Sequence, residues 1–351
     1  MLVTDPGMIA TGLVDHALDA LKQAGVTVTL FSDVQADPPE HVILNATDMA
    51  RAAKVQGVVG FGGGSSLDVA KLVALLAYGA ETLADVYGVG NAKGPRLPLI
   101  LVPTTSGTGS EVTPISIVTT GTNEKMGVVS PVILPDVALL DPELTYGLPP
   151  HITAATGIDA MVHAIEAYAS SNANNNPLSS MLATQALTLM GPSVLKAVHD
   201  GSDIQARGNM LLGSMLAGQA FANSPVAAVH ALAYPLGGHF HIPHGLSNAL
   251  VLPHVLRFNI ATAPQPYAEL APYAFPELAQ LEGQARAAAF CDSLAQLALD
   301  CGLQPNLRAM NIAQDDLPKL AADAMNQTRL LVNNPRPLTQ EDALAIYQAA
   351  Y

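Results

Sequence analysis

The first part of the chain, to about residue 145, alternates short apolar and β-branched runs with stretches of helical periodicity. The short runs occupy residues 26–31, 57–61 and 98–102. Alternation of this kind is typical of βαβ units, so it predicts a parallel sheet flanked by helices.

The pattern changes from about Pro149 onward, where long Ala- and Leu-rich stretches replace the β-rich runs. Apolar positions recur there at the helical period, which predicts helices over residues 154–169, 177–198 and 205–222. The asparagine-rich segment between the first two is predicted to be a loop. Thr339, followed by acidic residues, predicts the N-cap of a last helix that runs to about Tyr351.

These two patterns predict a two-domain protein. At 351 residues the chain exceeds the length at which single cores usually stop growing. We expect an α/β domain over residues 1–148 and an all-helical domain over residues 149–351, with the junction in the segment 142–150.

Composition and charge narrow the choice of partners. The formal net charge is -14, which argues against binding to nucleic acid or to anionic membranes. Every apolar run is broken before the roughly 18 residues that a membrane span needs, and no leader pattern opens the chain. Cys291 and Cys301 cannot build a disulfide scaffold and are expected to pack in the core, so we predict a cytoplasmic protein.

A glycine-rich turn follows the apolar run at residues 57–61. Gly62, Gly63, Gly64 and Ser65 lie between this run and a helical pattern. Glycines let backbone N–H groups approach an anion closely, and the N-terminus of a helix stabilises negative charge, so this turn suits a phosphate group. An ordinary tight turn between strand and helix explains the same residues about as well.

A second polar loop, residues 103–111, follows the run at 98–102 and is rich in hydroxyls and glycines. Ligands of open α/β sheets bind at the carboxyl ends of the strands, so two such loops on one sheet favour a dinucleotide. Asp5, after the apolar Leu2 and Val3, could bond the ribose hydroxyls and would repel a 2′-phosphate. The alternative is that Asp5 is a simple turn residue before Pro6.

Candidate metal ligands are concentrated in the helical half. Asp159 and His163 are four residues apart and therefore share one face of a helix. Four more histidines follow within residues 230–244. One carboxylate with two or three imidazoles suits Fe(II) or Zn(II) better than Mg(II) or Ca(II). The alternative is that these are hydrogen-bonded core residues and that Asp159 and His163 form a structural bridge.

Taken together, the motifs resemble those of the iron-containing alcohol dehydrogenases, which have a dehydroquinate synthase-like fold. The resemblance covers nearly the whole chain. It is based on residues 62–71, 103–111, 155–163, 230–254 and 334–337. It implies a metal-dependent, NAD-linked enzyme that interconverts a small primary alcohol or diol and its aldehyde.

The resemblance also implies roles for particular residues. The metal ligands would be Asp159, His163, His230 and His244, with Fe(II) as the ion and Zn(II) as the alternative. The NAD-binding residues would be Asp5, Gly62, Gly63, Gly64, Ser65, Asp68, Thr104, Thr105, Thr108 and Lys125, with Asp5 favouring NAD over NADP. The resemblance further implies a homodimer or larger homo-oligomer.

Two departures from the family pattern affect these expectations. Family members usually begin earlier, with a strand and a helix before the segment that contains Asp5, so an edge of the cofactor sheet is expected to be absent. The position four residues after His230 is commonly His in alcohol-oxidising members and is Tyr234 here. The proton relay would then use Tyr234, His241, the cofactor ribose or water.

Three functions therefore stay open from the sequence. The first is the NAD-linked alcohol dehydrogenase. The second is a hydroxyacid dehydrogenase or hydroxyacid–oxoacid transhydrogenase of the same family, because Tyr at position 234 is also expected there. The third is an inactive, truncated homologue that binds metal without a working cofactor site.

Overall fold

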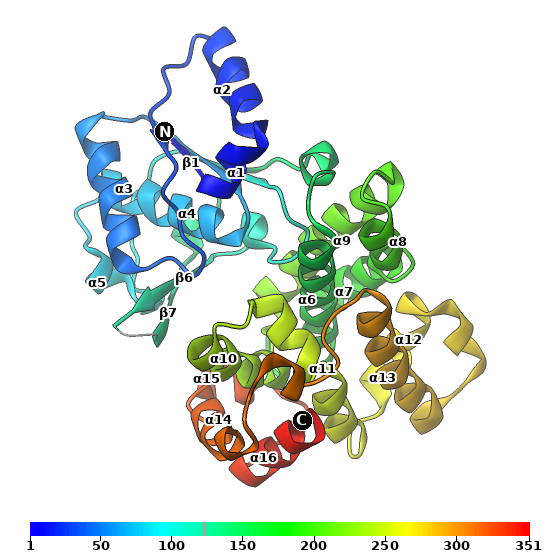
Figure 1. The fold of residues 1–351 in the computed structure, drawn as a ribbon. Helices are drawn as coiled ribbons and strands as arrows, with labels where there is room; N and C mark the ends of the chain where they lie inside the picture. Colours follow the sequence, from blue (N-terminus) through cyan, green and yellow to red (C-terminus); the bar gives the residue numbers. More distant parts are fainter. Residues whose placement is uncertain (122–123) are drawn as a thin grey trace. The chain divides into compact units, whose positions relative to one another are not determined.

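The computed structural model describes residues 1–121 and 124–351, which form two compact units (Figure 1). The first, the α/β unit, comprises Met1–Thr105 and Ser110–Gly147. The second, the helical unit, comprises Ser106–Gly109 and Leu148–Tyr351. The predicted fold class, an α/β part followed by a helical part, is confirmed.

A parallel five-stranded sheet forms the centre of the α/β unit, in the order β2-β1-β3-β5-β8. Its strands are β1 (Leu2–Val3), β2 (Leu30–Phe31), β3 (Val58–Gly62), β5 (Leu99–Pro103) and β8 (Val137–Ala138). The strand predicted over residues 26–31 is wrong except for its last two residues. Residues 25 and 26 instead donate backbone hydrogen bonds that close the end of the preceding helix.

Helices cover both faces of this sheet. On one face α3 (Glu40–Ala52) and α4 (Gly64–Tyr78) pack against a cluster that includes Val3. On the other face α2 (Leu13–Gln23) packs against a cluster that includes Leu2. The neighbours Leu2 and Val3 belong to opposite faces because successive side chains alternate along a strand. Two short helices, α1 (Pro6–Thr11) and α5 (Leu83–Val86), complete this unit.

A second, smaller sheet was not predicted from the sequence. Its order is β4-β7-β6, with β6 (Ile115–Thr120) antiparallel to β7 (Glu124–Val129) and β4 (Gly88–Val89) parallel to β7. The alternating partly buried and buried residues at the start of β6 are typical of a strand with one face against a core.

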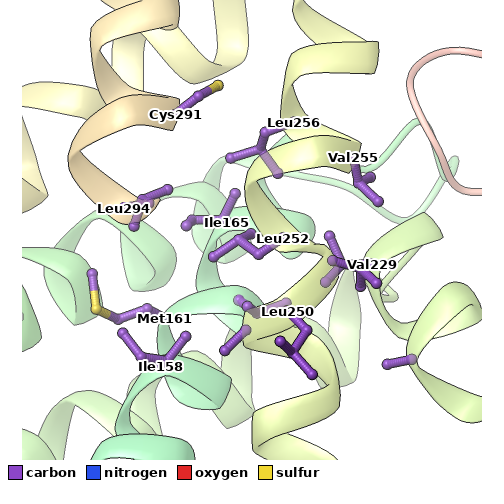
Figure 2. Packing of buried hydrophobic residues seen from close by; sticks show 14 of the residues in the cluster. Ile158, Met161, Ile165, Val229, Leu250, Leu252, Val255, Leu256, Cys291 and Leu294 are labelled. Carbon is purple, nitrogen blue, oxygen red and sulfur yellow. The ribbon is translucent and has the colours of Figure 1, made fainter. Parts of the chain in front are cut away.

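The helical unit is built around α6 (Pro150–Ala169), whose residues from Gly157 to Ala167 are all buried. A helix that is apolar on nearly all sides must be enclosed by others. Figure 2 shows Ile158, Met161 and Ile165 of α6 packed near Leu250 and Leu252. The other helices of this unit are α7 (Pro177–Met190), α8 (Val194–His199), α9 (Ile204–Asn223), α10 (Ala228–Phe240), α11 (His244–Ile260), α12 (Gln265–Ala274), α13 (Gly283–Asp300), α14 (Leu317–Ala324), α15 (Thr328–Leu331) and α16 (Gln340–Ala349).

The helix predicted over residues 177–198 is wrong in one respect, because it is two helices. The chain leaves α7 after Met190, and α8 starts at Val194. Pro192 between them has no N–H to donate and its ring clashes with the preceding turn, which favours the break between α7 and α8. The predicted N-cap is confirmed, since the hydroxyl of Thr339 accepts from the backbone N–H of Asp342.

The predictions for the two cysteines and for membrane spans can be compared with the structure. Cys291 and Cys301 are buried and free, which confirms their packing role. Across the described residues, no helix combines the length and the apolar character that crossing a bilayer requires.

Candidate metal centre and cofactor loops

Four side chains from three helices meet inside the helical unit. Asp159 and His163 lie one turn apart on α6, His230 is in the first turn of α10, and His244 is the first residue of α11. One potential ligand atom from each lies within 4.8 Å of all the others. These four residues could hold a metal ion, and we call them the metal-ligand cluster.

The spacing of the cluster fits a single ion. His230 Nε2 lies 3.8 Å and His244 Nε2 3.7 Å from Oδ1 of Asp159. A tetrahedral ion about 2.1 Å from each ligand would need ligand atoms roughly 3.4 Å apart, so these two separations need to shorten only slightly. Three nitrogens and one oxygen form the donor set that iron and zinc prefer.

The protonation states also favour a cation. Burial opposes the ionisation of Asp159, but the three histidines and Asn248 outweigh it, so the pKa of Asp159 is lowered. Burial lowers the pKa of His163 to about 3, although Asp159 opposes this shift. An ionised carboxylate and a neutral imidazole are the forms that bind metals.

A further layer of contacts orients the ligands. Nδ1 of His163 lies 3.1 Å from the carbonyl oxygen of Gly107, and Nδ1 of His230 lies 2.6 Å from a carboxylate oxygen of Glu166. When Nδ1 carries the proton, Nε2 is left with a lone pair for the metal. Asn248 donates to Oδ1 of Asp159 at 2.6 Å and so holds that carboxylate in place.

The predicted phosphate turn lies at the end of β3 and the start of α4. Gly62 has φ of 146°, and a Cβ there would meet the Ser66 side chain at 2.8 Å and the Asp5 carboxylate at 3.1 Å. Gly63 is the N-cap of α4 and offers no side chain to its first turn. A ligand that approaches the positive N-terminal end of this 15-residue helix would therefore meet only backbone atoms and small side chains. Ser65 and Gly64 are the first helical residues.

Asp5 lies beside this turn. Its carboxylate caps α1 by accepting from the N–H of Met8 at 3.1 Å, and it also accepts from the hydroxyl of Ser66 at 3.1 Å. Asp5 therefore lies at the glycine turn. Its bond to the N–H of Met8 also fits the alternative that it is a local turn residue before Pro6.

The second loop, residues 103–111, is divided between the two units. Thr104 and Thr105 belong to the α/β unit. A Cβ placed on Gly63 would lie 3.6 Å from Cγ2 of Thr105, so Thr105 lies beside the glycine turn. Thr108 belongs to the segment Ser106–Gly109, which packs with the helical unit. The structure therefore does not place the three predicted threonines in one unit.

Comparisons with known proteins identify the family of this chain. The family model for iron-containing alcohol dehydrogenase matches residues 1–142, and the model for the C-terminal part of the Fe-containing alcohol dehydrogenase family matches residues 153–351. Long-chain-alcohol dehydrogenase 1 of Geobacillus thermodenitrificans is 44% identical over 355 residues, which cover 100% of this chain and 89% of that protein. The chain belongs to the iron-containing alcohol dehydrogenase family.

Solved structures of the family share the fold of this alcohol dehydrogenase. A crystal structure of 1,3-propanediol oxidoreductase has a TM-score of 0.95 at 35% identity, covering 100% of this chain and 91% of that one. The sulfoacetaldehyde reductase of Bifidobacterium kashiwanohense, solved in complex with NAD+, has a TM-score of 0.88 at 30% identity, covering 99% and 90%. The chain is thus an oxidoreductase of alcohols from an iron-binding family.

Two other predicted cofactor residues of this dehydrogenase already have protein partners. Asp68 accepts from the hydroxyl of Ser110 at 2.6 Å and from the N–H of Ile117 at 2.9 Å. Lys125 on β7 forms a 2.7 Å ion pair with Asp37. Asp68 therefore ties α4 to the second loop and to β6, whatever else it contacts.

The two relay candidates are placed differently. The ring of Tyr234 lies 5.9 Å from the ring of His244 and one turn after His230 on α10. Burial raises the pKa of Tyr234, although a hydrogen bond from Arg329 opposes the shift. His241 is exposed and ends α10 with φ of 54°. Tyr234 is therefore beside the cluster and keeps its proton.

The side chains that contact the cluster from behind were not predicted from the sequence. Glu166, Asn248 and Phe221, which stacks on His163 at 4.4 Å between ring centroids, were not predicted. A signal existed for the first two. Glu166 is seven residues after Asp159 and Asn248 four after His244, so each shares a helix face with a ligand.

A buried ionisable pair beneath the second loop makes stability depend on pH. Lys71 donates to the Ser110 hydroxyl at 2.8 Å and to the Ile115 carbonyl at 2.6 Å. Burial raises the pKa of nearby Glu111 from 4.5 to about 7, although Lys71 opposes this. The folded state therefore holds a proton that the unfolded chain releases.

Replacing Glu111 with Gln should flatten this dependence. Because its folded pKa is raised, Glu111 contributes stability below pH 4.5 that is lost as pH rises through about 7. Relative to wild type, E111Q should gain about 3 kcal/mol in unfolding free energy between pH 4.5 and pH 8. Urea unfolding at several pH values measures this, and parallel curves would exclude Glu111 as the cause.

Proposed function

We propose that this enzyme interconverts small primary alcohols or diols and their aldehydes, with NAD as the hydride carrier. The metal-ligand cluster would hold Fe(II), with Zn(II) as the alternative ion. The convergence of one ionised carboxylate and three imidazoles within 4.8 Å is the observation that supports this most strongly. NADP is the less favoured cofactor because Asp5 lies beside the glycine turn.

When bound, the divalent cation would supply Lewis acidity at the alcohol oxygen and NAD would supply the hydride acceptor. The protein's own residues would position both. Gly62, Gly63, Gly64 and Ser65 would bind the pyrophosphate through backbone N–H groups and the N-terminus of α4. The ribose and nicotinamide contacts are assigned to Asp5, Asp68, Thr104, Thr105, Thr108 and Lys125, so the region of residues 1–148 would be the cofactor domain and residues 149–351 the metal domain.

The proposal is tested with metal-stripped protein. Fe(II) or Zn(II) is added back with NAD and a panel that includes 1,3-propanediol, short and long primary alcohols, and hydroxyacids. Turnover that depends on the ion and on NAD is expected for an alcohol or diol. Stoichiometric metal without NADH binding by fluorescence would support an inactive metal-binding homologue instead.

A hydroxyacid substrate is the second candidate. Arg329 is hydrogen-bonded to Tyr234, whose ring lies 5.9 Å from that of His244, so a cation contacts a neighbour of the cluster. A carboxylate or sulfonate on the substrate would suit that cation. Nicotinamide that co-purifies with the protein, and turnover of a hydroxyacid without added NAD, would favour this candidate.

Replacing Asp5 with Gly should relax the cofactor preference. Without the carboxylate, a 2′-phosphate would meet no repulsion at this position. The ratio of kcat/KM for NAD to that for NADP should fall about tenfold or more. An unchanged ratio would place the ribose elsewhere. Ser66→Ala removes the hydroxyl that Asp5 accepts from and serves as a milder comparison.

Replacing Tyr234 with Phe tests the proton relay. The phenol keeps its proton in its partly buried position, so it is suited to donate a hydrogen bond near the reacting oxygen. We expect kcat to fall about tenfold, with little change in bound metal. Full activity would remove Tyr234 from the relay and favour His241, the ribose or water.

We also propose a homodimer or larger assembly in the cytoplasm. The two buried free thiols fit a reducing compartment. Light scattering of the purified protein measures the assembly, and a monomeric mass would contradict it.

A further inference from the structure

Glu166 is a buried carboxylate immediately behind the metal-ligand cluster. It lies on α6, and its side chain is 4% exposed. Both of its oxygens accept hydrogen bonds within 2.6 Å, Oε1 from the backbone N–H of Val229 and Oε2 from Nδ1 of His230. It therefore reaches both the start of α10 and the ligand in the first turn of that helix.

The charge of Glu166 has no Lys or Arg partner among the described residues. Its one ion-pair contact there is with His230. A buried carboxylate without a cation is costly, so a positive charge is expected nearby. A divalent ion on the far side of the His230 ring would meet this need, because two positive charges would balance the carboxylates of Asp159 and Glu166.

We propose that Glu166 is a positioning residue that makes His230 a metal ligand. Its Oε2 fixes the imidazole in the tautomer with the proton on Nδ1, which leaves the lone pair of Nε2 directed to the ion. Its Oε1 caps the first turn of α10, where Ala227 provides no side-chain cap. This inference rests on the proposed metal centre and assigns it a charge-balancing residue outside the four ligands.

Substitutions that change hydrogen-bonding capacity and size separately can distinguish this role from simple packing. Glutamine has the same size as glutamate but only one acceptor oxygen. In E166Q the amide must turn its NH₂ group toward either Val229 N–H or His230 Nδ1. If it faces His230, the ring proton is driven to Nε2 and the ligand is lost. Aspartate is smaller but keeps two acceptors and the charge.

The experiment compares metal affinity in E166Q, E166D and the control E269Q. Glu269 is an exposed carboxylate in the same unit that accepts from the Tyr168 hydroxyl, so its substitution removes one charge away from the cluster. Zinc affinity is measured on apo-protein by competition with a chelator, and Co(II) absorption reports the ligand geometry. Circular dichroism of each apo-protein checks the fold.

We expect E166Q to lose about 10- to 100-fold in zinc affinity and to change the Co(II) spectrum. E166D should lose less than E166Q, and E269Q should match wild type. If packing were the role, the isosteric E166Q would bind like wild type and E166D would be weaker, which overturns the inference. If E166Q does not fold, E166D decides alone: a zinc affinity within about tenfold of wild type supports the inference, because aspartate keeps the charge and both acceptors, and a larger loss overturns it.

The experiment distinguishes a wrong role for Glu166 from a wrong assignment of the metal centre. Wild-type protein that binds one equivalent of zinc, together with E166Q of equal affinity, rejects only the role of Glu166. Wild-type protein that binds no metal rejects both proposals.

Discussion

Replacing His244 with Ala should remove most of the bound metal and nearly all alcohol dehydrogenase activity, while the fold survives. His244 is the first residue of α11, and its side chain is 41% exposed, so its loss creates no internal cavity. The loss of one ligand leaves an open shell of three. We expect activity to fall by at least about 100-fold, since even residues behind a ligand cost 10- to 100-fold. Metal analysis by emission spectrometry and the far-ultraviolet circular dichroism spectrum measure both parts.

His151→Ala is the matched control. His151 is an exposed imidazole on α6, the helix that provides two of the ligands, and it is outside the cluster. This variant should keep its metal and its activity. Unchanged metal occupancy in H244A would contradict the assignment of His244 as a ligand. A collapsed spectrum in H244A would instead show that the residue is needed for folding.

Replacing Gly245 with Ala should damage the same site through the backbone. A Cβ at Gly245 would lie 2.2 Å from the carbonyl oxygen of Ala155 on α6. Neither backbone can yield easily, so the start of α11 must move away from α6 and carry His244 with it. Overpacking of this kind costs about 1–3 kcal/mol. We expect that loss in unfolding free energy, measured with urea, and a loss of most bound metal.

Gly208→Ala is the comparison for this second variant. Gly208 is also inside a helix, α9, but a Cβ there meets no atom within 4 Å. Alanine should therefore stabilise the protein by about 0.5–1 kcal/mol through helix propensity and leave metal content unchanged. Equal metal retention in G245A and G208A would show that the close approach of α11 to α6 does not position His244.

Several features followed from local sequence alone. The four-residue spacing of Asp159 and His163 places them on one helix face, and the structure has them there. The turn from β3 to α4 follows from its glycines, and the N-cap at Thr339 from its hydroxyl and the acid three residues later. Such features depend on neighbours within one or two turns, so the local sequence specifies them.

Other features depended on contacts between distant segments. The local pattern indicated that histidines are concentrated near residue 240, but only the family resemblance singled out His230 and His244, and no local signal showed that His241 would stay exposed. The pairing of Glu166 with His230, 64 residues apart, was likewise invisible. So was the assignment of Ser106–Gly109 to the helical unit.

The physical reason is the range of the interactions. Backbone hydrogen bonds of helices and caps join residues three or four apart, so periodicity and capping residues specify them. The cluster instead depends on how α6, α10 and α11 pack, which is set by the shapes of apolar side chains far apart in the chain, such as those in Figure 2. Local pattern therefore determined the helices and their polar faces, and packing in three dimensions determined which of those faces meet.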